Sequence, residues 1–219
     1  MNKFAKEFML LIFVALPYLY LVAIWANLPD QAPTHFDVNG NPDDWSSKTF
    51  FLWFPLAMGL GNYLLMLILP SLDPKKKLSQ MGNAYFSIRV SMSVFICGLI
   101  LYIMHSSSIG RIQSPNFIFF LIGSMIALVG NYFQTIRHNY FIGIRTPWTL
   151  ENEQVWKETH VFGGRLWIIS GVLMIILSIL KLSQNILLNG FVLIAIIITL
   201  IPVVYSYLRF KKIDHSPGL

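Results

Sequence analysis

Six long apolar segments dominate this chain of 219 residues. They cover residues 8–27, 50–69, 87–104, 116–134, 166–182 and 186–207, with short polar stretches between them. An α-helix rises about 1.5 Å per residue, so roughly 20 residues cross a hydrocarbon core of roughly 30 Å. Only 12% of the residues are charged, about half the share that is usual in soluble domains. The pattern predicts an all-α membrane protein with six transmembrane helices.

The positions of Lys and Arg predict how these helices are oriented. If the N-terminus is cytoplasmic, the outer segments hold Lys48, Arg111 and Lys181. The other thirteen are then cytoplasmic: Lys3, Lys6, Lys75, Lys76, Lys77, Arg89, Arg137, Arg145, Lys157, Arg165, Arg209, Lys211 and Lys212. Cytoplasmic loops carry an excess of basic residues, so both termini are expected in the cytoplasm. The net charge of +6 therefore points to anionic membrane lipids as partners, and no direct nucleic-acid binding is expected.

The chain is expected to form one polytopic membrane domain over residues 1–219. Residues 8–69 form an N-terminal unit of two spans with an outer loop at 28–49. The first apolar run, from Phe8 to Ala26, is longer than the core of a secretory signal and lacks a small-x-small cleavage site, so it is interpreted as a retained span. The single Cys97 excludes an internal disulfide.

The outer loop from Leu28 to Thr49 is acidic and carries a turn signal. Asn39-Gly40 follows the alternating run from Thr34 to Val38, which predicts a tight β-hairpin on the membrane surface. Proline residues keep such strands short. Four aspartates oppose Lys48 in this loop, and three tryptophans are expected to anchor it at the interface: Asp30, Asp37, Asp43, Asp44, Trp25, Trp45 and Trp53.

The inner segment from Asn139 to Gly164 is dense in special residues. Thr146-Pro147 resembles a helix start, with Thr as N-cap and Pro in the first position. We expect an amphipathic helix from there to about His160, lying at the membrane interface. Its apolar side would carry Trp148, Val155, Trp156 and Phe162, and its wet side Glu151, Glu153, Lys157 and Glu158. Arg145 precedes the helix start, where the helix dipole disfavours a cation, so a carboxylate or carbonyl groups are expected to hold it.

Polar residues within the spans leave a transporter as one alternative. Asn62, Asn131 and Arg89 would line its path. The competing interpretation gives Asn62 an interhelical hydrogen bond and lets Arg89 reach lipid phosphates. No Asp or Glu lies inside the six apolar segments, which counts against proton-coupled transport.

A metal-dependent membrane enzyme is a weaker alternative. His35 and Asp37, with the other loop aspartates, would be its metal ligands, but their spacing matches no ligand motif. His160 with Glu158 or Glu153 would be an acid–base pair, although the wet face of a helix is the simpler interpretation. The chain has no HExxH, GxSxG or glycine-rich phosphate loop. No catalytic residue, metal or cofactor is therefore predicted.

Residues 130–164 resemble the signature of the SdpI family of bacterial membrane proteins, which are immunity proteins against a secreted toxin of the sporulation-delaying type. The matching positions in this chain are Gly130, Asn131, Ile136, Arg137, Asn139, Gly143, Ile144, Arg145, Thr146, Pro147, Trp148, Thr149, Leu150, Val155, Trp156, His160, Gly163 and Gly164. With its flanking spans, this signature unit is expected to cover residues 115–182. The outer loop is similar to a domain of unknown function that often precedes it, through Pro29, Pro33, His35, Phe36, Gly40, Trp45 and Lys48.

The resemblance implies a six-span protein of the bacterial cytoplasmic membrane that protects its host from a membrane-damaging peptide. It also implies signalling through a cytoplasmic DNA-binding repressor that is sequestered at the membrane. The expected toxin-facing residues are His35, Phe36, Asp37, Gly40, Trp45 and Lys48. The expected partner-binding residues of the inner loop are Asn131, Arg137, Asn139, Gly143, Arg145, Thr146, Pro147, Trp148, Trp156, His160 and Gly163.

Overall fold

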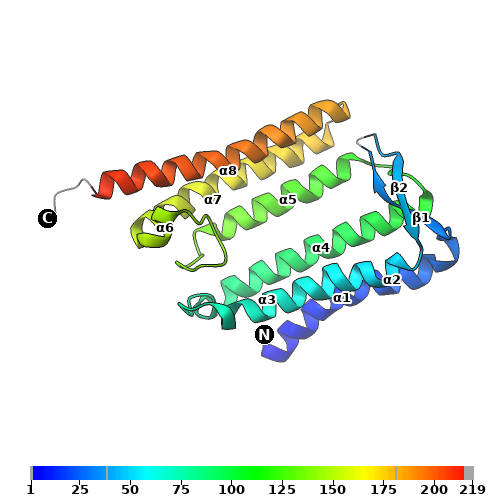
Figure 1. Ribbon diagram of the computed structural model, residues 1–219, viewed down its shortest axis with the longest axis horizontal. Helices are drawn as coiled ribbons and strands as arrows, with labels where there is room; N and C mark the ends of the chain where they lie inside the picture. The colour runs from blue at the N-terminus through cyan, green and yellow to red at the C-terminus, as the bar shows by residue number, and fades with distance from the viewer. Residues whose placement is uncertain (1, 38, 181, 215–219) are drawn as a thin grey trace.

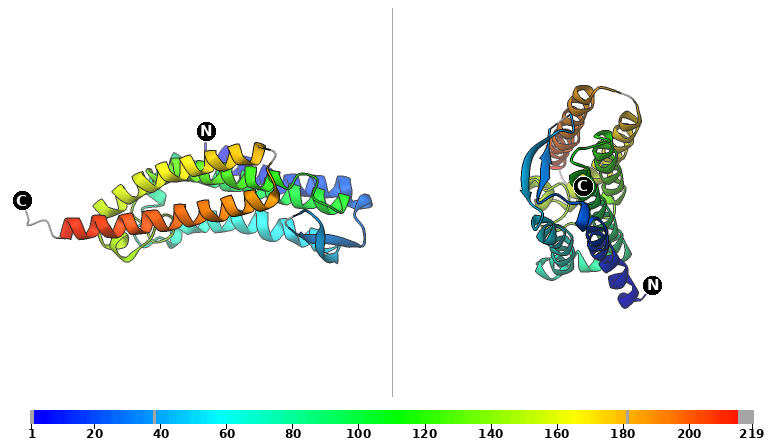
Figure 2. Two further views of the ribbon diagram at one scale, coloured as in Figure 1. Left: turned by 90° about the horizontal axis from the view of Figure 1, so that it is seen from above. Right: turned by 90° about the vertical axis from the view of Figure 1, so that its right-hand side faces the viewer.

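The structure, a computed structural model, describes residues 2–37, 39–180 and 182–214. Six helical segments in this part are long and apolar enough to cross a membrane, which confirms the predicted all-α membrane fold (Figure 1). They are α1 (Lys3–Ile24), a composite second span, α4 (Asn83–Ile109), α5 (Asn116–Phe133), α7 (Glu153–Ile179) and α8 (Gln184–Asp214). The helices run lengthwise beside one another (Figure 2).

The second span is irregular next to Pro55, which lacks the backbone N–H of a regular helix. It consists of α2 (Phe50–Pro55), a π-helical turn η2 (Leu56–Leu60) and α3 (Gly61–Leu72). Proline removes a backbone donor, and a wider π turn is one way in which a helix accommodates that loss. The segment still spans 23 residues.

The predicted hairpin is present. Strand β1 (Gln31–Phe36) pairs antiparallel with β2 (Pro42–Ser47), and Gly40 adopts φ +85° in the turn. The hairpin closes one end of the bundle, whereas α1 begins and α8 finishes at the opposite end (Figure 1). We call these the hairpin end and the terminal end. Val38 of the predicted run and Lys181, counted above as an outer cation, lie outside the described residues.

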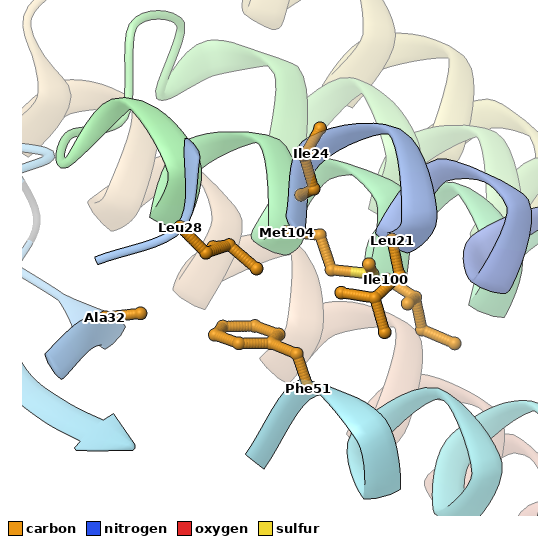
Figure 3. Packing of buried hydrophobic residues seen from close by; sticks show 7 residues of the cluster. All are labelled: Leu21, Ile24, Leu28, Ala32, Phe51, Ile100 and Met104. Carbon is orange, nitrogen blue, oxygen red and sulfur yellow. The ribbon is translucent and has the colours of Figure 1, made fainter. Parts of the chain in front are cut away.

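A buried apolar cluster joins the hairpin to the helices beneath it. Its seven residues come from α1, the hairpin region, α2 and α4 (Figure 3): Leu21, Ile24, Leu28, Ala32, Phe51, Ile100 and Met104. Ser107 of α4 also donates a hydrogen bond of 2.6 Å to the Pro33 carbonyl. The hairpin is thus part of the folded body, because both apolar packing and a buried hydrogen bond hold it to the helices.

Helices α5 and α7 pack closely through glycines spaced seven residues apart. A Cβ on Gly171 would lie 2.5 Å from the Gly123 carbonyl oxygen, and one on Gly164 would lie 2.7 Å from that of Gly130. Small residues let helix backbones approach closely in a membrane, where lipid gives little hydrophobic drive for helix association. These contacts fix α7, and with it the segment that leads into it, against α5.

A carboxylate and a guanidinium form an ion pair near the terminal end of the bundle. Glu7 of α1 accepts two hydrogen bonds from Arg89 of α4, at 2.7 and 2.8 Å. The Tyr63 hydroxyl of α3 donates to the same carboxylate. The expectation that the spans lack carboxylates was wrong, because α1 starts earlier than its apolar run and includes Glu7. Arg89, 8% exposed, binds this partner instead of reaching lipid.

Candidate functional site

The segment 134–152, which we call the elbow, links α5 to α7 at the terminal end. The prediction of one continuous helix from Thr146 to about His160 was wrong. Helix α6 (Pro147–Glu151) is only five residues long, and the chain becomes extended at Asn152. The Asn152 side chain then accepts hydrogen bonds from the backbone N–H groups of Gln154 and Val155, so α7 starts at Glu153 and continues through the fifth span.

Asn139 determines the first half of the elbow. Its side chain is fully buried, and its oxygen accepts hydrogen bonds from the backbone N–H groups of Phe141 and Ile142 at 2.7 and 2.8 Å. Its amide nitrogen donates to the carbonyls of Arg137 and Ile142. One side chain thus satisfies four backbone groups of a loop that has no regular structure.

His160 supports the second half of the elbow. It is 1% exposed, and its Nε2 accepts a hydrogen bond of 2.9 Å from the Ile144 backbone N–H. Its Nδ1 therefore carries the proton and donates to the Trp156 carbonyl at 2.8 Å. Gly143 lies against the same ring with φ +118°. His160 is thus neither on a wet face nor paired with Glu153 or Glu158, as the acid–base alternative required.

Two further aromatic rings complete this packing. The Trp156 ring stacks on His160 with a centroid distance of 4.1 Å, and its Nε1 donates to the Ile136 carbonyl at 2.9 Å. His138 lies 5.1 Å from the Trp156 ring and hydrogen-bonds through Nε2 to the Leu150 carbonyl. Burial, and then the Lys75 ammonium at 3.3 Å, lower the pKa of His138 below its usual value, so this imidazole stays neutral.

Thr146 and Trp148 attach the elbow to α8. Thr146 caps α6 as predicted, with Pro147 in the first helical position, and its side chain accepts from the Thr149 backbone N–H. The Trp148 indole donates a hydrogen bond to the buried Ser206 hydroxyl. Trp148 is therefore partly buried against α8.

Arg145 is exposed, and its guanidinium donates to the Tyr140 carbonyl at 2.6 Å. The expected carbonyl contact is therefore present.

A pocket of about 260 Å³ opens beside the elbow, at the start of α7. Its lining comes from the α3–α4 loop, the elbow and α7: Lys77, Gln134, Thr135, Ile136, Arg137, His138, Glu153, Trp156, Lys157 and His160. It brings together three of the expected partner-binding residues, namely Arg137, Trp156 and His160. Of the other eight, six lie in the elbow outside the lining of the pocket, Asn131 is exposed on α5, and Gly163 of α7 packs against Ile144 of the elbow.

The expected toxin-facing residues lie on or beside the hairpin. Trp45 and His35 are exposed, Phe36 is half-buried, and Lys48 pairs with Asp30 at 3.0 Å. Gly40 is buried against Ile112 and Pro115, and its carbonyl accepts a hydrogen bond from the Ile112 backbone N–H, so it is not part of the exposed surface.

Asp37 organises the hairpin turn. Hydrogen bonds from the backbone N–H of Asn41, and then from Asn39, lower the pKa of its carboxyl. The His35 side chain contacts Asp43, at 2.6 Å between Nδ1 and Oδ1. Within the described residues, no three His, Cys, Asp or Glu side chains are grouped to hold a metal ion. Asp30, Asp43 and Asp44 are exposed, whereas Asp37 is half-buried.

The three residues of the transporter alternative do not line one path. Asn62 borders a small hollow between α1, the second span and α4 that has no room for a water molecule. Arg89 is occupied by Glu7, and Asn131 lies on the outer surface of α5.

Several residues that shape the site escaped the sequence analysis. His138 and Ser206 hold the elbow through contacts that only the fold reveals. The signal for Asn152 was present, because an Asn followed by Glu in the first turn is a common helix start.

Two family models and one curated relative match this chain. Residues 135–206 match the SdpI/YfhL protein family, and residues 12–59 match a domain of unknown function, DUF1648. The chain is 26% identical over 216 residues to the immunity protein SdpI of Bacillus subtilis (strain 168), which covers 96% of this chain and 99% of the relative. No solved structure matches the chain.

Proposed function

We propose that this chain is an immunity protein of the cytoplasmic membrane, on the premise that its residues 135–206 match the SdpI/YfhL protein family. It would protect its host from a secreted toxin peptide of the sporulation-delaying type. One observation carries the proposal: the similarity to an immunity protein extends over 96% of this chain and 99% of the relative. The similarity therefore covers nearly all of both chains, rather than one common module. The orientation with both termini in the cytoplasm is part of the proposal.

The hairpin is the surface proposed to meet the toxin. Asp43 and Asp44 are exposed on β2, and the next residue, Trp45, is 50% exposed. An acidic surface with an exposed aromatic ring suits a cationic or amphipathic peptide, because charge attracts it and the ring offers apolar contact. The hairpin is firmly attached to α1, α2 and α4, so it would present a preformed surface.

The elbow is proposed as a second site, which sequesters a cytoplasmic DNA-binding repressor. Its exposed Arg145 and partly buried Trp148 lie at the opposite end of the bundle from the hairpin. Coupling two sites requires an element that both contact. Helix α4 contacts both sites, because its Ser107 holds the hairpin and its Ile88 belongs to the same buried cluster as Ile136 of the elbow, and so it supports such coupling. No chemistry of its own is assigned to the protein.

A protection assay tests the immunity function. Toxin-sensitive bacteria would express the chain, and their membrane potential would be followed after a sporulation-delaying-type toxin is added. Cells with the wild type are expected to hold their potential. The Asp43→Asn/Asp44→Asn variant should lose protection, whereas Glu151→Gln, which removes an exposed acid at the terminal end, should keep it. Depolarisation despite verified membrane insertion would contradict immunity to this toxin and bring the transporter alternative forward.

Recruitment of a fluorescent repressor to the membrane tests the elbow separately. Arg145→Ala and Trp148→Ala are expected to abolish recruitment while protection and insertion remain. Lys211→Ala, an exposed cation at the end of α8, serves as the matched control. Normal recruitment by both elbow variants would remove the elbow from the signalling step.

A further inference from the structure

The pocket beside the elbow carries a surplus of positive charge. Lys77, Arg137 and Lys157 line it, and Glu153 is the carboxylate in its lining, so three cations face one anion. Arg137 donates to the neutral Gln80 side chain. Within the described part of the chain, the ammonium groups of Lys77 and Lys157 have no hydrogen-bond or ion-pair partner. Neighbouring like charges repel, so a bound anion would stabilise this arrangement.

These cations come from three different segments. Lys77 lies in the α3–α4 loop, Arg137 in the elbow and Lys157 in the second turn of α7. The Trp156 ring lines the same pocket and is itself almost fully buried, being held by its hydrogen bond to Ile136. The pocket therefore combines one buried aromatic wall with cationic side chains that are exposed or half-buried.

We propose that this pocket binds a phosphate-bearing anion. An Arg guanidinium pairs with phosphate oxygens through two parallel hydrogen bonds, and Lys adds a point charge. The pocket lies at the end of the transmembrane helices, where basic pockets accept phospholipid headgroups. The same chemistry accepts free phosphate. Because Lys77 belongs to the first half of the chain and Lys157 to the second, the anion would hold the two halves together at the terminal end. The site would exist whichever toxin the protein recognises.

Thermal unfolding of the purified full-length protein in a neutral detergent tests the site. Phosphatidylglycerol, phosphatidylcholine and inorganic phosphate would be titrated separately at constant ionic strength. Phosphatidylglycerol is expected to raise the unfolding midpoint in a saturable way, and phosphatidylcholine, whose headgroup has no net charge, to raise it much less. Stabilisation by inorganic phosphate as well would identify the phosphate group itself as the ligand. Stabilisation by the lipid alone would identify the headgroup as its source.

Charge variants assign the effect to the pocket. Lys77→Gln/Arg137→Gln/Lys157→Gln is expected to weaken apparent phosphatidylglycerol affinity by about tenfold or more, since each contact to a charged group contributes measurably. Lys77→Arg/Arg137→Lys/Lys157→Arg, which keeps the three positive charges, should retain most of the phosphatidylglycerol affinity. Lys211→Gln should change it less than about twofold, because a distant exposed charge is screened.

Three results would overturn the proposal. The first is equal stabilisation by the two lipids with no response to phosphate. The second is a loss of phosphatidylglycerol affinity in Lys211→Gln that is as large as the loss in the triple variant. The third is the absence of stabilisation by both phosphatidylglycerol and inorganic phosphate. If the triple variant does not fold, the three wild-type titrations still decide whether a phosphate-bearing anion binds.

Discussion

Gly143 and His160 are in contact at a distance that leaves no room for a side chain at position 143. A Cβ there would lie 2.3 Å from His160 Nε2, and the backbone already has φ +118°. The same Nε2 accepts the Ile144 backbone N–H. The shape of the elbow therefore depends on the absence of a side chain at one position and on an imidazole at the other.

Gly143→Ala is expected to destabilise the protein. The positive φ alone costs about 1–3 kcal/mol for a residue with a Cβ, and displacing His160 would add the loss of its hydrogen bond to Ile144. The free energy of unfolding in detergent measures the effect. Gly110→Ala is the matched control, because Gly110 has φ +83° but nothing within 4 Å of the added Cβ. Equal losses in the two variants would show that the contact with His160 contributes nothing.

Local signals in the sequence predicted much of this architecture. The six apolar segments were long enough to identify the spans, and Asn39-Gly40 identified the hairpin. Thr146-Pro147 marked a helix start correctly, since an N-cap depends on residues within one turn. What failed was the length of that helix, because Asn152 was overlooked as a second start.

Contacts between distant residues were beyond such reasoning. Glu7 lies 82 positions from Arg89, and Trp148 lies 58 positions from Ser206. Nothing in either neighbourhood indicates its partner. His160 was expected on a wet surface because its helix was taken as separate from the bundle, whereas α7 packs against α5 from its first turns and buries it.

Gly171→Ala is expected to loosen the pairing of α5 and α7. The new Cβ would lie 2.5 Å from both the Gly123 carbonyl oxygen and the Ala127 backbone nitrogen. Backbone atoms cannot rotate away as a side chain can, so the helices must separate, at about 1–3 kcal/mol of unfolding free energy. In the control Gly190→Ala, the nearest atom lies 3.8 Å away, and this variant should retain its stability. A neutral Gly171→Ala would mean that the two helices separate without loss.

Glu7→Gln should be more damaging than the loss of a surface ion pair. Arg89 would keep its charge in a site where its side chain is 9% exposed. Breaking one partner of a buried pair costs about 3–5 kcal/mol, and we expect the lower end because the Glu7 side chain is 23% exposed. Lys48→Gln, whose partner Asp30 is largely exposed, should cost under about 1 kcal/mol.

A double-mutant cycle with Arg89→Met isolates the interaction between Glu7 and Arg89. If the two single losses simply add in the double variant, the pair is not coupled and the ion pair does not join α1 to α4.

Acid should weaken the elbow through His138. Burial and the Lys75 ammonium lower the pKa of this imidazole in the folded protein below the value of about 6.5 that it has when unfolded. The unfolded chain therefore binds more protons in the interval between the two pKa values. The stabilising contribution of neutral His138 is complete above about pH 6.5 and is lost as the pH falls through the folded pKa.

Unfolding free energies of the wild type and His138→Gln, compared from about pH 7.5 to about pH 5, test this expectation. Other carboxylates titrate in both proteins, so the difference between the two curves isolates His138. The difference should shrink towards acid. In a Lys75→Gln background, the folded pKa of His138 should rise towards its usual value, because the larger of the two lysine charges that lower it is gone, and the acid-dependent difference should become smaller. Parallel curves for the wild type and His138→Gln would show that His138 binds protons equally in the folded and unfolded states.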